Sequence, residues 1–451
     1  MYVLPTPVSF LARFAELISP QWFADRVPDR GPGSRKGIFS GPVVTWLMIV
    51  QRLHPKGTLH SALEQLMQHW PVALLPACKR VLEHRVSANP GGYCEARHKM
   101  PTLVINQVCD QLLAKLQAAL PGTPGNCSHP VYLLDGSSLE LQHTAELVAA
   151  YPPAENQLGQ SHWPILRIAV LHNLANGLAL RPTWGPMYGP HAVSEQALAA
   201  ELMKRLPPRA IVVADRNFGI FSTAYDTQQH GHQVVLRLTE ERFKKITGGV
   251  GFSGQDMPVV WKPSRWDRKA HPELPADAVV KGRVIVAQLV SDTKTELLYL
   301  FTTLDLPAEE VLAIYGYRWY VEVDLRSLKA TVRLHQLTSK SVDMMEKELV
   351  MAIAAYNIVR AVIGWAAEQS AVEPRSLSFS LVQNVVEAAL PILAGAKTPE
   401  EFATAFDRMM FHARTYCRLP KRTKRRSFPR MIWGHSRTFP KRKLTPMDKT
   451  I

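Results

Sequence analysis

The segment from Tyr315 to Lys329 can form one helix that carries four of its polar side chains on a single side. At roughly 100° per residue, Arg318, Glu322 and Lys329 fall within an arc of about 60° of Tyr315. The remaining surface of this helix includes an apolar side formed by Val321, Leu325 and Leu328. Such a helix must pack its apolar side on a core and leave its polar side available. A solvated face with charge pairs four residues apart is the alternative.

Two aspartates upstream each end an apolar run that is typical of a buried strand. Residues 131–134 lead to Asp135, and residues 210–214 lead to Asp215. An acid at the C-terminal end of a core strand lies where active-site groups collect in sheet-based folds, although it can also cap the turn that follows. With Glu322, these acids make three converging oxygen donors of the kind that Mg²⁺ prefers, and the neighbouring cations and phenol suit a phosphate backbone.

These residues resemble the DDE transposases of bacterial insertion sequences. Tyr315, Arg318, Glu322 and Lys329 fit without a gap the Tyr-x2-Arg-x3-Glu-x6-Lys signature of one branch of that family. Further similar segments are found at 134–137 around the first aspartate, at 194–219 up to the second, at 93–97 in the N-terminal part and at 425–430 near the C-terminus. The resemblance therefore spans nearly the whole chain.

The resemblance implies a metal-dependent DNA transposase that nicks the ends of its element and joins the freed 3′-hydroxyl to target DNA. It assigns catalysis and the binding of two Mg²⁺ ions, with Mn²⁺ as a possible substitute, to Asp135, Asp215 and Glu322. It assigns contacts with DNA phosphates to Tyr315, Arg318 and Lys329. Arg216 and Arg326 are candidates for further phosphate contacts, and the alternative is that each pairs with a neighbouring acid.

The fold class expected is α/β, with a ribonuclease H-like catalytic core that a β-rich insertion interrupts. A helical N-terminal domain and a helical, basic C-terminal region flank this core. The expected boundaries are 1–125 for the N-terminal DNA-binding domain, 126–239 for the first part of the core, 240–305 for the insertion, 306–365 for the rest of the core, and 366–451 for the C-terminal region and tail. The ribonuclease H-like fold is an analogy taken from the family.

Hydrophobic periodicity predicts the helices and strands of this fold. Helices are predicted at 43–50, 59–70 and 103–120, and strands at 130–135, 138–142, 164–172 and 178–184, the last two joined at Asn176–Gly177, a hairpin signal. Next come a helix at 194–206, a strand at 210–215, a helix at 219–229 and a strand at 233–239. The insertion contributes strands at 257–261, 279–290 and 296–303.

Aromatic residues of the insertion bear on one step that some family members use. In those proteins, a tryptophan on the last insertion strand stacks on a flipped base while a DNA hairpin forms. Here that strand offers Tyr299 in place of tryptophan, and Trp261 and Trp266 lie earlier in the insertion. Packing is the default role of such a tryptophan. The sequence therefore departs from the family pattern at this point.

Positive charge is concentrated at the C-terminus. Between residues 408 and 447 there are 13 Lys and Arg and no Asp or Glu, whereas the rest of the chain has 40 basic and 38 acidic residues. Because Phe428, Trp433 and Phe439 are interleaved with these cations, the tail is predicted to bind phosphates and stack on bases. A tail that only increases solubility is the alternative. The predicted partners are double-stranded DNA, namely terminal inverted repeats and target DNA, and a second copy of the chain in a synaptic complex.

The sequence favours a cytoplasmic protein with no membrane partner. The five cysteines are scattered without metal-binding spacing, which predicts reduced thiols. No basic region followed by an apolar core is found at the N-terminus. The apolar stretch 349–367 contains Asn357 and Arg360 and is therefore predicted to be a buried core helix.

Two other functions share part of this pattern. Another nuclease with a ribonuclease H-like fold would need the three acids but not the signature spacing. A non-catalytic DNA-binding repressor derived from such an element would need only the basic regions. Inverted repeats bracketing the reading frame would favour the transposase.

Overall fold

A computed structural model describes residues 20–26, 37–54, 57–70, 74–76, 78–123, 127–156, 159–290, 295–334 and 337–420. The described residues up to Arg418 form one compact unit, here called the first unit. The predicted basic tail lies almost wholly outside the described residues. The expected domain boundaries within the first unit stay predictions.

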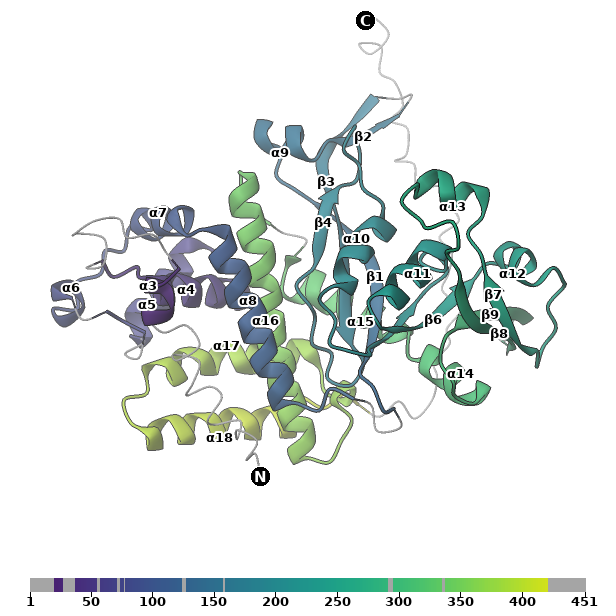
Figure 1. The fold of residues 1–451 in the computed structure, drawn as a ribbon. Helices are drawn as coiled ribbons and strands as arrows, with labels where there is room; N and C mark the ends of the chain where they lie inside the picture. The colour runs from purple at the N-terminus through teal and green to yellow at the C-terminus, as the bar shows by residue number, and fades with distance from the viewer. Residues whose placement is uncertain are drawn as a thin grey trace, which may run out of the picture. The chain divides into compact units, whose positions relative to one another are not determined.

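A nine-stranded mixed sheet forms the centre of the first unit (Figure 1). Its path runs in the order β2-β3-β1-β5-β6-β9-β8-β7, with β4 paired to β3. The strands are β1 (Val131–Glu140), β2 (Pro153–Asn156), β3 (Gly159–Asn173), β4 (Thr183–Pro186), β5 (Ile211–Ala214), β6 (Gln233–Leu238), β7 (Asp256–Trp261), β8 (Val280–Val290) and β9 (Thr295–Thr302). The α/β class is thereby confirmed.

One long strand, β1, replaces the two strands that were predicted at 130–135 and 138–142. It pairs with antiparallel β3 without interruption from Tyr132 to Glu140. The turn-forming residues after Asp135 stay extended because the β3 ladder satisfies their backbone groups. Asp135 is consequently in the middle of a strand, and the prediction that it ends one is wrong.

The predicted insertion strands are present, and the predicted hairpin forms with a shorter second strand: β4 begins only at Thr183, and near the turn a single bridge joins His172 and Ala179. β3 and β4 are antiparallel and joined through Gly177, whose φ of 75° favours glycine. The three insertion strands continue the same sheet, because β9 pairs antiparallel with β6 and β8 pairs with β9. Two short helices also belong to this part of the chain, α12 (Glu240–Thr247) and α13 (Arg265–Ala270).

Helices cover the sheet and extend the core beyond it. α10 (Glu195–Met203) packs on β3 and β4 and beside α11 (Phe221–Gln229), which contacts β6. α14 (Ala308–Gly316), α15 (Trp319–Arg326) and a π-helical turn (Ser327–Thr331) follow β9, and α15 packs on β1. Figure 1 shows α10, α11 and α15 near β1, the strand that carries Asp135.

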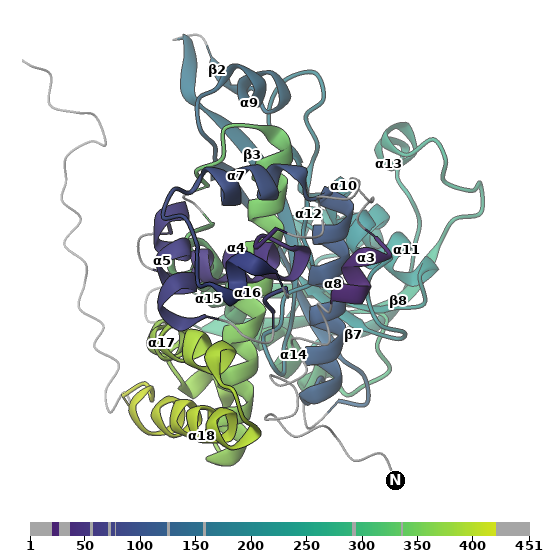
Figure 2. The same ribbon diagram turned by 90° about the vertical axis from the view of Figure 1, so that its left-hand side faces the viewer.

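A long buried helix, α16 (Val342–Gln369), connects the sheet with the helical part of the chain. Figure 2 shows it among the other helices, and it packs against α4, α8, α17 and α18. The N-terminal helices are α3 (Pro20–Ala24), α4 (Gly41–Leu53), α5 (Leu59–His69), α6 (Lys79–Leu82), α7 (Gly91–Lys99) and α8 (Thr102–Ala119). The rest are α9 (Ala145–Ala150), α17 (Phe379–Gly395), α18 (Pro399–Tyr416) and a 3₁₀ turn (Pro374–Ser376). The three predicted N-terminal helices are confirmed as α4, α5 and α8.

α16 is also the one helix of the described residues that is long and apolar enough to cross a membrane. Its most apolar window is completely buried inside the protein. Asn357 is hydrogen-bonded there to the backbone of Ala179, and Arg360 pairs with Asp324 of α15. The predicted core helix is therefore confirmed. All five cysteines are unpaired, as expected.

Candidate active site

Asp135 on β1 and Asp215 directly after β5 lie at the same level of two neighbouring parallel strands. β1 and β5 pair in register, and the last pair joins Leu134 with Ala214. Each aspartate is the residue that follows this pair. Because β5 ends there and β1 continues, the parallel ladder stops where the two acids lie side by side.

Each of these carboxylates accepts a hydrogen bond from a nearby backbone N–H. Gly136 N donates to Asp135 Oδ1 at 2.8 Å, and Asn217 N donates to Asp215 Oδ1 at 2.8 Å. The second contact is the turn-capping role that the sequence left open for Asp215. It engages one of the two carboxylate oxygens. Asp135 lies in mid-strand and caps no turn.

The electrostatic surroundings of Asp135 disfavour its ionised form. The pKa of this carboxyl is raised to about 6, mainly by burial and also by the negative charges of Asp215 and Glu195. The backbone N–H of Gly136 and the guanidinium of Arg318 act in the opposite direction. A group of carboxylates held this close favours a cation among them.

The four signature residues do not lie on one continuous helix, and that prediction is wrong. Tyr315 is on α14 and Glu322 is on α15. α14 ends at Gly316, a poor helix former, and in the turn that follows Arg318 N bonds to the carbonyl of Tyr315, three residues back, at 2.9 Å. Lys329 lies in the π-helical turn after α15. Turns of this rare type often mark functional sites.

The signature segment is nevertheless fastened to the strand that carries Asp135. Lys329 Nζ donates to Ser137 Oγ at 3.0 Å and to the carbonyl oxygen of Ser138 at 3.1 Å. Since α15 also packs on β1, the segment is held there by side-chain and helix contacts together. The polar side chains that were expected to meet are thereby brought to one region.

Two further signature side chains have charged neighbours in this region. Tyr315 is 8% exposed. Its pKa is raised by burial, while the charges of Arg237 and Arg318 lower it and that of Asp215 raises it. Arg318 Nη2 donates to Glu322 Oε1 at 2.6 Å in a partly exposed ion pair.

The three expected metal ligands are only partly assembled. Among the described residues, no group of three His, Cys, Asp or Glu side chains is close enough to hold a metal ion. Asp135 and Asp215 are neighbours, but the Glu322 carboxylate is engaged with Arg318. Carboxylate oxygens are the donors that Mg²⁺ prefers, so the chemistry of the donor set fits such an ion.

The remaining candidates differ in exposure. Arg216 and Arg326 are both exposed, and the carbonyl of Arg216 accepts a hydrogen bond from Arg242 at 2.8 Å. Their role in binding phosphates stays a prediction. Tyr299 is 7% exposed and its ring packs against Phe243 at 4.7 Å, so it is a core residue and does not present its ring to DNA.

The two insertion tryptophans also have different surroundings. Trp261 is buried and packs edge-on against Phe301, which is the default role expected of it. Trp266 is 75% exposed. Another exposed tryptophan, Trp319, follows Arg318 directly and is 55% exposed.

One acid of the site was missed in the sequence. Glu195 begins α10, where it looked like an ordinary first-turn acid after the N-cap Ser194. Its side chain reaches the β1 backbone at Gly136, and its Oε2 accepts a hydrogen bond from Asn217. Only the segment around Glu195 was noted as similar to the family. No local signal could show that packing of α10 on β3 brings this carboxylate to the two aspartates.

The sequence of this chain is similar to those of known proteins. Residues 126–358 match the family described as the transposase DDE domain. The chain is 24% identical over 405 residues to the transposase InsG for insertion sequence element IS4 of Escherichia coli strain K12, covering 86% of this chain and 84% of that protein. Among solved structures, the piggyBac transposase synaptic complex with hairpin DNA is similar with a TM-score of 0.42 and 10% identity, covering 93% of this chain and 85% of that one. Because the family match takes in more than half of the residues, including both aspartates and the signature segment, the chain belongs to the family of transposases with a DDE domain.

Proposed function

We propose that this DNA transposase of an insertion sequence works by cut-and-paste chemistry, with Asp135, Asp215 and Glu322 as the acids that bind divalent metal ions. Family membership gives the reaction class, DNA cleavage and strand transfer. The observation that carries the assignment of residues is the parallel pairing of β1 with β5, which makes Asp135 and Asp215 neighbours.

The acids fit Mg²⁺, with Mn²⁺ as a substitute, because all three offer hard oxygen donors. When bound, such ions activate the attacking water or 3′-hydroxyl and stabilise the leaving oxygen. For Glu322 to take part, its carboxylate must leave Arg318. A DNA phosphate is a suitable replacement partner for that guanidinium, since Arg binds phosphate through charged hydrogen bonds.

The cations and phenol of the signature would hold DNA phosphates beside the acids. Arg318 lies at the turn between α14 and α15, and Lys329 is fixed on β1 through Ser137. Their charges would orient the scissile strand rather than react with it. Tyr315, Arg216 and Arg326 are proposed as further contacts with the same backbone.

A ribonuclease H-like core remains the proposed fold of the catalytic part, with the domain boundaries expected from the sequence. The order of elements supports it. The antiparallel strands β1, β3 and β4 are followed by α10, β5, α11 and β6, and the acids lie on β1, after β5 and on α15.

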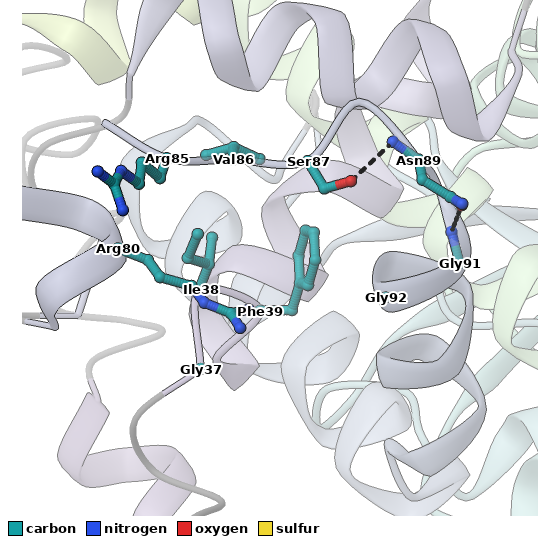
Figure 3. A pocket seen from close by; sticks show the side chains of 10 residues that line it. All are labelled: Gly37, Ile38, Phe39, Arg80, Arg85, Val86, Ser87, Asn89, Gly91 and Gly92. Atoms are coloured by element: carbon teal, nitrogen blue, oxygen red, sulfur yellow. Dashed lines mark hydrogen bonds between the residues drawn. The ribbon is translucent and has the colours of Figure 1, made fainter. Parts of the chain in front are cut away.

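The N-terminal helices are proposed to bind the terminal repeats. A pocket of about 380 Å³ in this part of the chain has features that suit DNA (Figure 3). Its lining consists of Gly37, Ile38, Phe39, Arg80, Arg85, Val86, Ser87, Asn89, Gly91 and Gly92. Two exposed guanidinium groups beside apolar side chains can contact phosphate and sugar together. Synapsis of two DNA ends implies at least a dimer, which is also part of the proposal.

Single neutral replacements of the three acids test the proposed function. In Asp135→Asn, Asp215→Asn and Glu322→Gln, we expect cleavage of DNA carrying the element's ends to be lost in Mg²⁺, because each change removes a charged metal ligand. Specific binding to the same DNA should persist in a gel-shift assay, since the acids do not hold the duplex.

Glu201→Gln is the matched control, because Glu201 is exposed on α10 and pairs with Lys204 at the surface. It should cleave like the wild type. Persistent cleavage in Glu322→Gln would show that the assignment of the acids is wrong. Specific binding without cleavage by the wild type in any divalent metal would instead favour the non-catalytic repressor.

A further inference from the structure

Glu195 lies closer to the two aspartates than its place in the sequence suggests. It is the first residue of α10, whose N-cap Ser194 accepts a hydrogen bond from Ala197 N at 3.1 Å. The helix packs on β3, the neighbour of β1 in the sheet. The Glu195 side chain therefore extends toward the strand that carries Asp135.

Glycine at position 136 makes room for this carboxylate. A Cβ atom placed on Gly136 would lie 2.3 Å from Glu195 Cδ and 2.5 Å from its Oε1, far inside contact distance. Any larger residue would push the carboxylate away from β1. The φ angle of Gly136 is not among the positive ones, so the close approach of Glu195 is what requires glycine here.

Asn217 links the same carboxylate to Asp215. Asn217 Nδ2 donates to Glu195 Oε2 at 2.5 Å, and Asn217 N donates to Asp215 Oδ1 at 2.8 Å. Gln196 Nε2 donates to Asn217 Oδ1 at 3.0 Å, which fixes the orientation of the amide. Glu195 is thus held against the β1 backbone at Gly136, the residue after Asp135, and is joined to Asp215 through Asn217.

We propose that Glu195 is a fourth carboxylate of the acidic site and that it strengthens the binding of a divalent cation by Asp135 and Asp215. This inference rests on the proposed function. Holding a third negative charge against two others costs free energy unless a cation offsets the repulsion. A residue that served only to orient Asn217 would need no charge, since an amide oxygen accepts the same hydrogen bond.

Glu195→Gln separates these two roles, because it removes the charge and keeps an acceptor for Asn217. Binding of Mn²⁺ to the full-length protein without DNA would be measured by titration calorimetry and by the paramagnetic resonance of free Mn²⁺. We expect affinity roughly tenfold or more below that of the wild type, the size typical for loss of a group that supports a metal site. Gly136→Ala, which displaces the carboxylate without removing it, should weaken binding in the same direction.

Thermal melting without metal is the control for folding, and Glu201→Gln on the same helix is the control for charge. Both glutamine variants should melt no lower than the wild type. Unchanged Mn²⁺ affinity in Glu195→Gln, with binding lost in Asp215→Asn, would overturn the role of Glu195 and leave the proposed function standing. If the wild type itself binds no Mn²⁺, the proposed function fails and the inference fails with it.

Discussion

The carboxyl of Asp135 is held in surroundings that oppose its own ionisation. Its pKa is raised from 3.8 to about 6, mainly by burial and then by Asp215 and Glu195. Above the folded-state pKa the ionised carboxylate therefore destabilises the metal-free protein. Below the unfolded-state pKa of 3.8 the group is protonated in both states and this effect is absent.

Asp135→Asn should consequently stabilise the metal-free protein while abolishing cleavage. Since one pKa unit is roughly 1.4 kcal/mol, the gain in unfolding free energy at pH 8 is at most about 3 kcal/mol. The gain should shrink as the pH falls from 6 toward 4. Melting temperatures of both proteins in a chelator, measured across this range, test the prediction. A pH-independent difference would mean that packing, not charge, separates the two proteins.

At the residue scale, the sequence predicted the site residues that stand in a local pattern, and it missed the one that only tertiary contacts bring to the site. Asp135 and Asp215 could be picked out because each follows a run of apolar residues. Glu195 could not, because its place in the site depends on the packing of α10 and on the missing side chain at Gly136. The pairing of Arg318 with Glu322 follows from their spacing of four residues, but which partner Glu322 chooses is decided by its surroundings.

At the scale of elements, a buried cluster of charged side chains holds α15 in place. Asp324 is completely buried and accepts two hydrogen bonds from Arg375, both at 2.8 Å, and it also pairs with Arg360 of α16. Burial alone would raise the pKa of Asp324, but the two arginines hold it below its usual value. The helix that carries Glu322 is thereby fixed to α16 and to the 3₁₀ turn before α17.

Removing the acid should release this anchor. Asp324→Ala leaves two largely buried arginines without their partner, and breaking a buried pair in this way costs about 3–5 kcal/mol. Urea unfolding measures the loss, and cleavage should fall with it because the helix that carries Glu322 is no longer fixed to α16. Val323→Ala, at a more exposed position of the same helix, should stay within about 0.5 kcal/mol of the wild type. Equal stability of the two variants would show that the cluster does not anchor α15.

The signature cations give a second prediction at this scale. Arg318→Ala and Lys329→Ala should each weaken binding of cleaved DNA ends by about 1.5–3 kcal/mol, the worth of a charged hydrogen bond, and should slow strand transfer. Binding is measured by competition with unlabelled ends at fixed salt. The control is Lys204→Ala, whose side chain pairs with Glu201 on the surface of α10. Wild-type binding in both signature variants would show that these residues form a solvated surface and do not contact DNA.

Most elements were predictable from the sequence, because apolar periodicity fixes their type. The elements that were predicted wrongly have specific physical causes. After Gly316, Arg318 N bonds to the carbonyl three residues back, which interrupts the signature helix. The hydrophobic periodicity of the sequence does not reveal this interruption. The unbroken β1 depends on its pairing with β3, a partner that the local residues of 136–138 do not reveal.

At the scale of the whole molecule, buried ion pairs join the N-terminal helices to α16. Glu348 of α16 pairs with Arg52 of α4 at 2.8 Å and with Arg97 of α7 at 3.1 Å. Arg97 ends the N-terminal segment that resembles the family. That resemblance therefore coincides with residues that tie the proposed DNA-binding helices to the core, and not with exposed contacts to DNA.

The charge distribution predicts how the whole protein holds DNA. A chain ending after Pro420 keeps α18 and the bridge between Leu377 and Arg418, and it loses ten of the clustered cations. If about four of those cations contact phosphates, the slope of log K against log salt should flatten by about 4, at roughly 0.9 per contact. Fluorescence anisotropy over a salt series measures it, with Mn²⁺ binding as the control that should not change. An unchanged slope would make the tail a solubility element.

The ladder between β6 and β9 has a consequence for the order in which the protein can fold. β6 is complete at Leu238, but its outer neighbour β9 does not begin until Thr295. A chain emerging from the ribosome folds from its N-terminal side, and an unpaired strand edge is a template for pairing with other chains. The growing chain therefore carries an open sheet edge until Thr302, about two thirds of the way along the sequence, has left the ribosome and β9 can close that edge.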